Sequence, residues 1–269
     1  MSPTPPGHIA SLYRYPVKGL TPEPLPRVVL DVGQTLPADR RYAIENGPSG
    51  FDPTAPKWLP KPHFLMLMRD EWLAALQTHF DDASNVLTIR QNGAIRAQGD
   101  LETAEGRGAI ERFFATGFAE AIKGPPKVLS GHGHSFSDVA RKVVSIINLG
   151  SIAAIGNMVD APVNPLRFRA NLYVSGWPAW HELDLIDHVI TIGETRLKVV
   201  KRIVRCAAVN VDPESAARDL NIPQALMRRL GHADCGVYAE VIAGGSIGVG
   251  DAVVTEQPEL ARSQFVGMT

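Results

Sequence analysis

Short runs of β-branched and aromatic residues, each bounded by proline or glycine, recur along most of this 269-residue chain. Runs of this kind are typical of β-strands. The pair Asn92-Gly93 and the segment Gly193-Glu194-Thr195 each separate two such runs, which predicts two hairpins, the second ending near Cys206. The other predicted strands are Ile9–Val17, Arg27–Leu30, Arg41–Glu45, Val143–Ile147, Phe168–Ser175, Cys235–Ile242 and Asp251–Glu256. We therefore expect an α+β protein that is predominantly β, with a barrel or sandwich in its second half.

Four segments predict helices. Asp70–Phe80 and Arg107–Ile122 carry apolar side chains at helical spacing, and Ser151–Val159 follows a predicted strand. The segment that starts at Asn221 has that residue as an N-cap, proline in the first turn, and Gly231 just after its end. The predicted strands thus outnumber the predicted helices.

Two segments rich in glycine predict loops. Gly124–Asp138 also contains proline and serine, and we take it as the junction between two domains, residues 1–125 and 126–269. Gly244–Asp251 precedes a strand rather than a helix, so it predicts a turn between barrel strands and not a phosphate-binding loop.

Charge and hydropathy patterns argue against several classes of partner. The net charge is −1 and both signs are spread along the chain, which leaves no basic face for nucleic acid. The start has no charged segment followed by an apolar core, and the uncharged run from Val143 to Val159 is short and interrupted by polar residues. Two cysteines without a secretory signal favour reduced thiols. We expect a cytoplasmic protein without a membrane span.

Common catalytic motifs are missing from the sequence. Neither Cys206 nor Cys235 has the neighbouring ligands that a zinc site needs, and there is no GxSxG or GxxxxGK[ST] motif. His132 and His134 lie two residues apart in a predicted loop, where a solvated loop is favoured over a metal site.

Cys206 follows Arg205 at the end of a predicted strand, and two interpretations remain open. It is either a small buried apolar residue or a thiolate that binds a metal. Adjacency to Arg205 does not decide between them, because neighbours on a strand point to opposite faces. A single thiolate would suit a metal that arrives already held by an organic sulfur chelate.

Five segments, in this order, resemble the MOSC family, which is named for the C-terminal region of the molybdenum cofactor sulfurase. They match the two-part form seen in the mitochondrial amidoxime-reducing component and its bacterial relatives. The segments Phe51–Phe64 and Ser135–Asp138 depart from the pattern of those relatives. The five matching segments are YPVKGL (Tyr15–Leu20), ADRRYAIEN (Ala38–Asn46), RFRANLYVSG (Arg167–Gly176), RCAAVNVDPESA (Arg205–Ala216) and CGVYAEVIAGGSIGVGDAV (Cys235–Val253).

This resemblance implies a MOSC-type β-barrel with flanking helices, preceded by a β-rich N-terminal region. It also implies a pterin-based molybdenum cofactor (molybdopterin), with Cys206 as both the metal ligand and the catalytic residue. Basic and amide side chains would hold the cofactor, since forked guanidinium groups and lysine suit a phosphate. By motif position these cofactor-binding residues are Lys18, Arg40, Arg169, Asn171 and Arg205.

Two functions follow from the resemblance. The first is an oxidoreductase that reduces small N-hydroxylated or related N–O and S–O substrates; the alternative is a non-catalytic cofactor-binding or sulfur-carrier module that serves other molybdoenzymes. Pyridoxal phosphate is not expected, because that chemistry belongs to a separate domain of fused members. With only two cysteines, no CxxCH motif and no GxGxxG after a strand, an oxidoreductase would need a separate electron-transfer protein.

Overall fold

The centre of the protein is a closed barrel of seven strands. The computed structural model describes residues 6–256, so the ends of both predicted domains, 1–5 and 257–269, lie outside it. Pairing of the first and last barrel strands closes the sheet, and every pairing is antiparallel except that of β9 with β10. Around the barrel the strands are β10 (Leu172–Ser175), β9 (Val144–Asn148), β13 (Asp234–Ala243), β12 (Thr195–Val204), β11 (Val189–Ile192), β15 (Ala252–Glu256) and β1 (Gly7–Arg14).

Alternating apolar side chains fill this barrel. On β12, Thr195, Leu197 and Val199 are buried, while Arg196 and Lys198 between them are exposed. Alternation of this kind is expected for strands with one face toward a core and one toward solvent. The predicted α+β, predominantly β fold is therefore confirmed.

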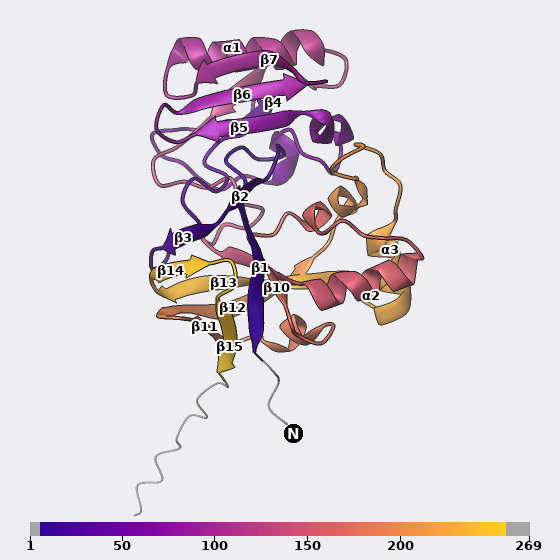
Figure 1. Cartoon of the computed structure of the whole chain (residues 1–269). Helices are drawn as coiled ribbons and strands as arrows, with labels where there is room; N and C mark the ends of the chain where they lie inside the picture. Colours follow the sequence, from indigo (N-terminus) through magenta and orange to yellow (C-terminus); the bar gives the residue numbers. More distant parts are fainter. Residues whose placement is uncertain (1–5, 257–269) are drawn as a thin grey trace, which may run out of the picture.

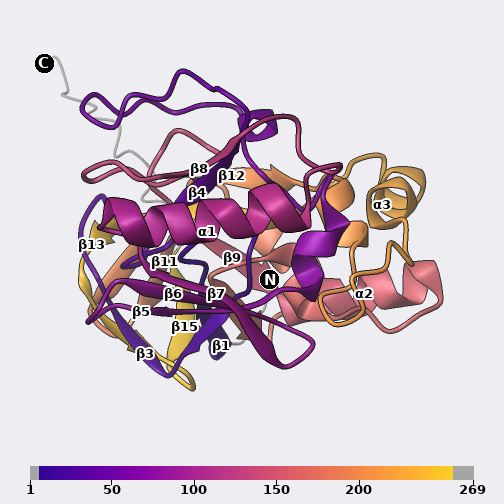
Figure 2. The same ribbon diagram turned by 90° about the horizontal axis from the view of Figure 1, so that it is seen from above.

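The N-terminal part sits on one end of the barrel (Figure 1). Its three-stranded sheet is covered by α1 (Ala104–Gly117), which contacts β7 and β8 and lies across the small sheets when the molecule is seen from above (Figure 2). The strands of this part are β5 (Gln77–Asp81), β6 (Val86–Gln91) and β7 (Ala94–Asp100) in one sheet, and β4 (Ala43–Asn46) with β8 (Pro126–Leu129) in another.

The two halves of the chain share their sheets. Strand β1 is a member of the barrel, and β2 (Glu23–Leu25) pairs with the C-terminal end of β1. Strand β3 (Arg27–Leu30) pairs with β14 (Gly245–Gly248), so both β1 and β3 pair with strands of the C-terminal half (Figure 1). The segment that we expected to be a junction contains β8, which pairs back with β4.

Helices α2 (Leu149–Val159) and α3 (Ile222–Leu230) pack together beside the barrel (Figure 1). Helix α3 ends as predicted, with Gly231 in the left-handed conformation at φ 78°. The Asn221 side chain does not cap it; instead Asn210 Oδ1 accepts a hydrogen bond from the backbone N–H of Ile222. No helix of residues 6–256 is both long and apolar enough to span a membrane.

Several predicted element boundaries are wrong. The expected helix at Asp70–Phe80 is a 3₁₀ helix (Glu71–Ala75) followed by β5, because pairing of β5 with β6 overrides the apolar spacing. The expected strand at Phe168–Ser175 is shortened to β10, because a 3₁₀ helix (Pro165–Phe168) and Arg169 at φ 51° precede it. The helix expected at Arg107–Ile122 is α1, which Thr103 caps four residues earlier.

The other loop and hairpin predictions have mixed outcomes. The expected turn at Gly244–Asp251 holds β14, and the first strand is Gly7–Arg14 rather than Ile9–Val17. Both predicted hairpins are confirmed: β6 and β7 flank Asn92-Gly93, while β11 and β12 flank Gly193-Glu194. Strand β12 ends two residues before Cys206.

Candidate functional site

A cavity of about 260 Å³ opens between the barrel and the N-terminal part. Its wall includes the loop after β1, the segment before β4, the loop after β8, and the chain from Lys201 to Val209 around the end of β12. All six residues that the resemblance singles out line this one cavity, although they come from four separate segments: Lys18, Arg40, Arg169, Asn171, Arg205 and Cys206. Their roles as ligands stay predictions.

The cavity wall is strongly basic. Eight lining residues are lysine or arginine and two, Asp39 and Asp138, are acidic, in a chain whose net charge is −1. Such a concentration of one sign in a recess raises the local affinity for anions. The eight basic residues are Lys18, Arg40, Lys61, Arg167, Arg169, Lys201, Arg202 and Arg205.

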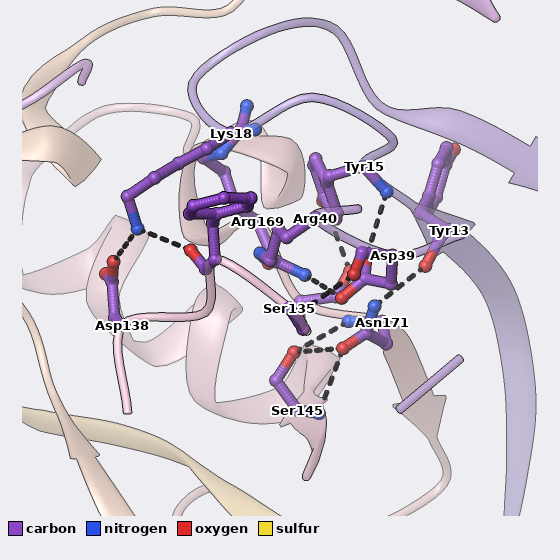
Figure 3. Close-up of polar contacts among 12 residues, drawn as sticks. Tyr13, Tyr15, Lys18, Asp39, Arg40, Ser135, Asp138, Ser145, Arg169 and Asn171 are labelled. Atoms are coloured by element: carbon purple, nitrogen blue, oxygen red, sulfur yellow. Dashed lines mark hydrogen bonds and ion pairs between the residues drawn. The ribbon is translucent and has the colours of Figure 1, made fainter. Parts of the chain in front are cut away.

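Lys18 lies in the loop after β1 and is nearly buried, with 7% of its surface exposed. Its Nζ donates to Asp138 Oδ1 at 2.5 Å and to the Phe136 carbonyl oxygen at 2.9 Å (Figure 3). Burial lowers the pKa of Lys18, and the charge of Asp138 opposes this effect. Partial burial opposes ionisation of Asp138, but the neighbouring ammonium group outweighs it and lowers the pKa of the carboxyl to about 2.

Arg40 and Arg169 are held around the ring of Tyr15. Their Cζ atoms lie 4.5 Å and 4.3 Å from the centroid of that ring, within the range of cation–π attraction. Arg40 also forms an ion pair with Asp39 and donates from Nη2 to the Arg169 carbonyl oxygen at 2.9 Å (Figure 3). Asp39 in turn accepts from the backbone N–H of Tyr15 at 2.8 Å. This network fixes two like charges close together.

One guanidinium nitrogen of Arg169 is free to bind a ligand. Its Nη2 is buried and has no hydrogen-bond partner among the described residues. Burial, with the nearby charge of Arg40, lowers the pKa of Arg169 to about 10. A buried guanidinium nitrogen without a partner is costly, so an anion that supplied an acceptor would relieve that cost.

Asn171 is committed to the framework of the protein. Its Oδ1 accepts from the backbone N–H and the hydroxyl of Ser145, at 3.1 and 2.8 Å (Figure 3). Its Nδ2 donates to the Tyr13 carbonyl oxygen at 3.1 Å, which ties β1 to β9. At most one amide hydrogen of Asn171 is left for a ligand.

Arg205 is also used mostly for structure. It donates from Nε to the Cys235 carbonyl oxygen at 2.6 Å and from Nη1 to the Phe168 carbonyl oxygen at 2.9 Å. Its Nη2 is buried, has no hydrogen-bond partner within residues 6–256, and lies against Gly236, where an added Cβ would be 2.7 Å away. Arg205 therefore joins β13 to the turn that carries Arg169.

The two cysteines have different environments, and both are free. Cys206 is half-buried and lines the cavity. Cys235 is fully buried, and burial raises the pKa of its thiol to about 12. Of the two, Cys206 alone offers a sulfur atom to a ligand in this cavity.

Three residues of the site network did not stand out in the sequence: Tyr15, Asp39 and Asp138. Tyr15 and Asp39 lie inside the motifs that carry the resemblance, but their apolar and acidic side chains are unlike phosphate-binding groups. Asp138 belongs to a segment that departs from the family pattern. The ring of His134 packs against Phe51 and Phe136. No cluster of three or more metal-ligating side chains occurs within residues 6–256.

Comparisons with solved structures give similarities at low sequence identity. The YUAD protein from Bacillus subtilis is 14% identical, with 93% of this chain and 94% of that chain covered and a TM-score of 0.47. YiiM from Geobacillus stearothermophilus is 16% identical, with 44% and 56% covered and a TM-score of 0.35. YiiM from Escherichia coli is 18% identical, with 42% and 54% covered and a TM-score of 0.32. A comparison with curated proteins gave no match.

Two family models match adjoining parts of the chain. The MOSC N-terminal beta barrel domain matches residues 6–121, and the MOSC domain matches residues 130–254. Together they span both halves of the structure, and every residue that lines the basic cavity lies within one of the two matches. The chain therefore belongs to the proteins that combine a MOSC N-terminal beta barrel domain with a MOSC domain.

Proposed function

We propose that this protein is an oxidoreductase that binds a pterin-based molybdenum cofactor in the basic cavity, with Cys206 as the protein ligand to the metal. One observation carries the proposal: a half-buried thiol lies in the wall of a cavity with eight basic and two acidic residues. Soft thiolate sulfur suits molybdenum held by organic sulfur, and guanidinium groups suit the cofactor's phosphate.

The residues present fit such an anionic group. Arg169 Nη2 is buried and has no hydrogen-bond partner in the described part of the chain, so it can donate to a phosphate oxygen at no loss of an existing bond. Lys18 and Arg40 supply further positive charge. Lys18 forms an ion pair with Asp138, and Arg40 forms one with Asp39. Asn171 and Arg205 act mainly by holding the cavity wall in place through their backbone contacts.

When bound, the cofactor supplies a metal that changes its oxidation state by two electrons. The proposed substrates are small N-hydroxylated compounds or related N–O and S–O compounds. Reduction of an N-hydroxylated amine consumes two electrons and two protons and releases the amine and water. The basic wall stabilises anionic groups during this exchange, and partial burial of Cys206 limits the access of water to the sulfur.

The proposed reaction needs a separate electron-transfer protein. An iron–sulfur cluster normally takes four cysteines, whereas this chain has two and Cys235 is fully buried. Mixing the purified protein with an N-hydroxylated substrate and NADH or NADPH should give no sustained turnover. Adding reduced viologen or an electron carrier should start it. Turnover with the nicotinamide alone would refute this part of the proposal.

A sulfur-carrier function is the second candidate, favoured by the single half-buried thiol at the cavity wall. In that function Cys206 would hold a persulfide for delivery to another molybdoenzyme. A carrier would bind the cofactor or the sulfur without turning over N-hydroxylated substrates with reduced viologen. Pyridoxal phosphate is not proposed for either function.

Metal and pterin analysis tests the common basis of both candidates. We expect molybdenum and pterin to copurify with the protein from a host that makes the cofactor, and Cys206→Ala to lower the molybdenum content or change its spectroscopic signature. Cys235→Ala is the matched control, because its buried thiol does not line the cavity. Protein without molybdenum after expression in such a host would refute the proposal.

A further inference from the structure

Arg218 connects two walls of the cavity that come from different halves of the chain. From Nη2 it donates to the carbonyl oxygens of Leu67 and Met68, at 3.0 and 2.9 Å. From Nη1 it donates to the carbonyl oxygen of Ala207, at 3.1 Å. Leu67 and Met68 line the cavity, and Ala207 directly follows Cys206.

An ion pair anchors this arginine on the N-terminal side. Glu71 Oε2 accepts from Arg218 Nε at 3.2 Å and from Nη2 at 3.0 Å. Glu71 begins the 3₁₀ helix that follows the Leu67–Met68 wall. Since a guanidinium group is planar and carries five donors, it can reach three carbonyl groups and a carboxylate at once, which lysine cannot do.

Asp219, the residue after Arg218, binds the same segment to the barrel side of the cavity. Asp219 accepts two hydrogen bonds, both at 2.8 Å, from the buried guanidinium of Arg167, another residue of the cavity wall. Arg167 also binds Asp212 and the carbonyl oxygen of Asn210. The chain from Cys206 to Asp219 is thus held to the barrel side by Arg167 and to the N-terminal side by Arg218.

We infer that Arg218 is a positioning residue for Cys206, which sets the segment after this cysteine at a fixed distance from the Leu67–Met68 wall. An isolated surface ion pair would contribute little, because Arg218 and Glu71 are 31% and 44% exposed. The contacts to three backbone carbonyl groups distinguish Arg218 from such a pair, since they hold main chain on both sides of the cavity.

Hydrogen exchange of the ligand-free protein tests this role without any cofactor. In Arg218→Met, amide protection should fall in residues 66–71 and in residues 207–212, by roughly tenfold, the factor that corresponds to about 1.4 kcal/mol. Amides expected to report it include Val209, which donates to the Cys206 carbonyl oxygen, and Asp70, which donates to that of Met66. Arg218→Lys should recover part of the protection at residues 66–71 through Glu71 but little at residues 207–212.

Arg196→Met is the matched control. Among residues 6–256 the Arg196 side chain pairs only with Glu256, and it lies at the start of β12, whereas Cys206 follows the end of that strand. Its removal should leave both segments unchanged. Unchanged protection of the two segments in Arg218→Met would overturn the inference, and so would an equal loss of protection in the barrel strands, because that would indicate general destabilisation.

An effect of Arg218 on a bound metal rests on the proposed function, in which Cys206 is the metal ligand. If the protein carries molybdenum, Arg218→Met should alter the spectroscopic signature of the metal site while Arg196→Met does not. A metal signature that is identical in wild type and Arg218→Met would limit Arg218 to general stability and overturn its positioning role. If wild-type protein binds no molybdenum, the proposed function fails, and the exchange measurement still decides the role of Arg218.

Discussion

Lys18 and Asp138, which lie 120 residues apart in the sequence, form an ion pair in the wall of the cavity, with Lys18 Nζ 2.5 Å from Asp138 Oδ1. The lysine follows a strand of the barrel, and the aspartate belongs to the loop after β8. Burial lowers the pKa of Lys18, and the charge of Asp138 opposes this effect and so favours the ammonium form next to the arginines of the site.

Asp138→Asn should lower stability in a pH-dependent way. The pKa of Asp138 is about 2 in the folded protein, below the ordinary value of about 3.9, so its carboxylate stabilises the fold above pH 4 and loses that effect as the pH falls toward 2. Because the side chain is 49% exposed, we expect a loss of only about 1 kcal/mol at pH 7. Urea unfolding at several pH values measures it, and a difference from wild type that is equal at pH 7 and pH 2.5 would contradict the pairing.

Thiol labelling should distinguish the two cysteines. In native protein near neutral pH, one thiol should react quickly with a disulfide reagent, and in denaturant both should react. Cys206→Ala should abolish the native reaction, since Cys235 is fully buried and its pKa is raised to about 12. Rapid native labelling of Cys235 in this variant would show that the region around β13 opens more readily than its packing indicates.

The hairpins were the most predictable part of the fold. Asn92-Gly93 and Gly193-Glu194 both mark turns whose geometry depends on local residues, so the sequence next to them suffices. The helix prediction for Asp70–Phe80 failed because apolar spacing alone did not identify a third hairpin. Residues Gln77–Asp81 form β5, which pairs with the next strand, β6, and this pairing overrides the helical spacing of the apolar side chains.

The candidate site was predictable only through motifs in a fixed order. Composition and periodicity say nothing about which loops meet, and Lys18, Arg40 and Arg169 come together only once the chain folds. The adjacency of Arg205 and Cys206 left two interpretations open in the sequence. In the structure Arg205 turns to the Cys235 and Phe168 carbonyl groups, while Cys206 lies at the cavity wall.

Gly236→Ala should be strongly destabilising. The residue has a φ of +78°, and an added Cβ would lie 2.7 Å from both Arg205 Nη2 and the Ile146 carbonyl oxygen. Gly93→Ala is the matched control, because Gly93 has nearly the same φ, +77°, and nothing within 4 Å of an added Cβ. We expect a loss of about 1 kcal/mol for Gly93→Ala and about 3 kcal/mol or more for Gly236→Ala by urea unfolding. Equal losses would mean that both the Arg205 side chain and the β9 backbone at Ile146 move aside at little cost.

Arg167 and Arg169 belong to one turn, and their replacement by methionine should have opposite effects on stability. Arg167 is 4% exposed and binds Asp212, Asp219 and the Asn210 carbonyl oxygen, so Arg167→Met should cost about 3 to 5 kcal/mol. Arg169 has a buried Nη2 to which no other described residue offers an acceptor, so Arg169→Met removes an uncompensated polar group. Urea unfolding of ligand-free Arg169→Met should show a stability equal to or above that of wild type.

The same Arg169→Met variant should lose affinity for anions, which links the buried nitrogen to function. A charge-assisted hydrogen bond contributes about 1.5 to 3 kcal/mol, so affinity for pyrophosphate should fall by about 10- to 100-fold in calorimetry. Methionine keeps the backbone strain at φ 51° unchanged, so the comparison isolates the guanidinium. A gain in stability together with a loss of anion affinity is the behaviour of a residue kept for binding. A variant that is less stable yet binds pyrophosphate as wild type does would instead assign Arg169 to the framework, beside Arg167.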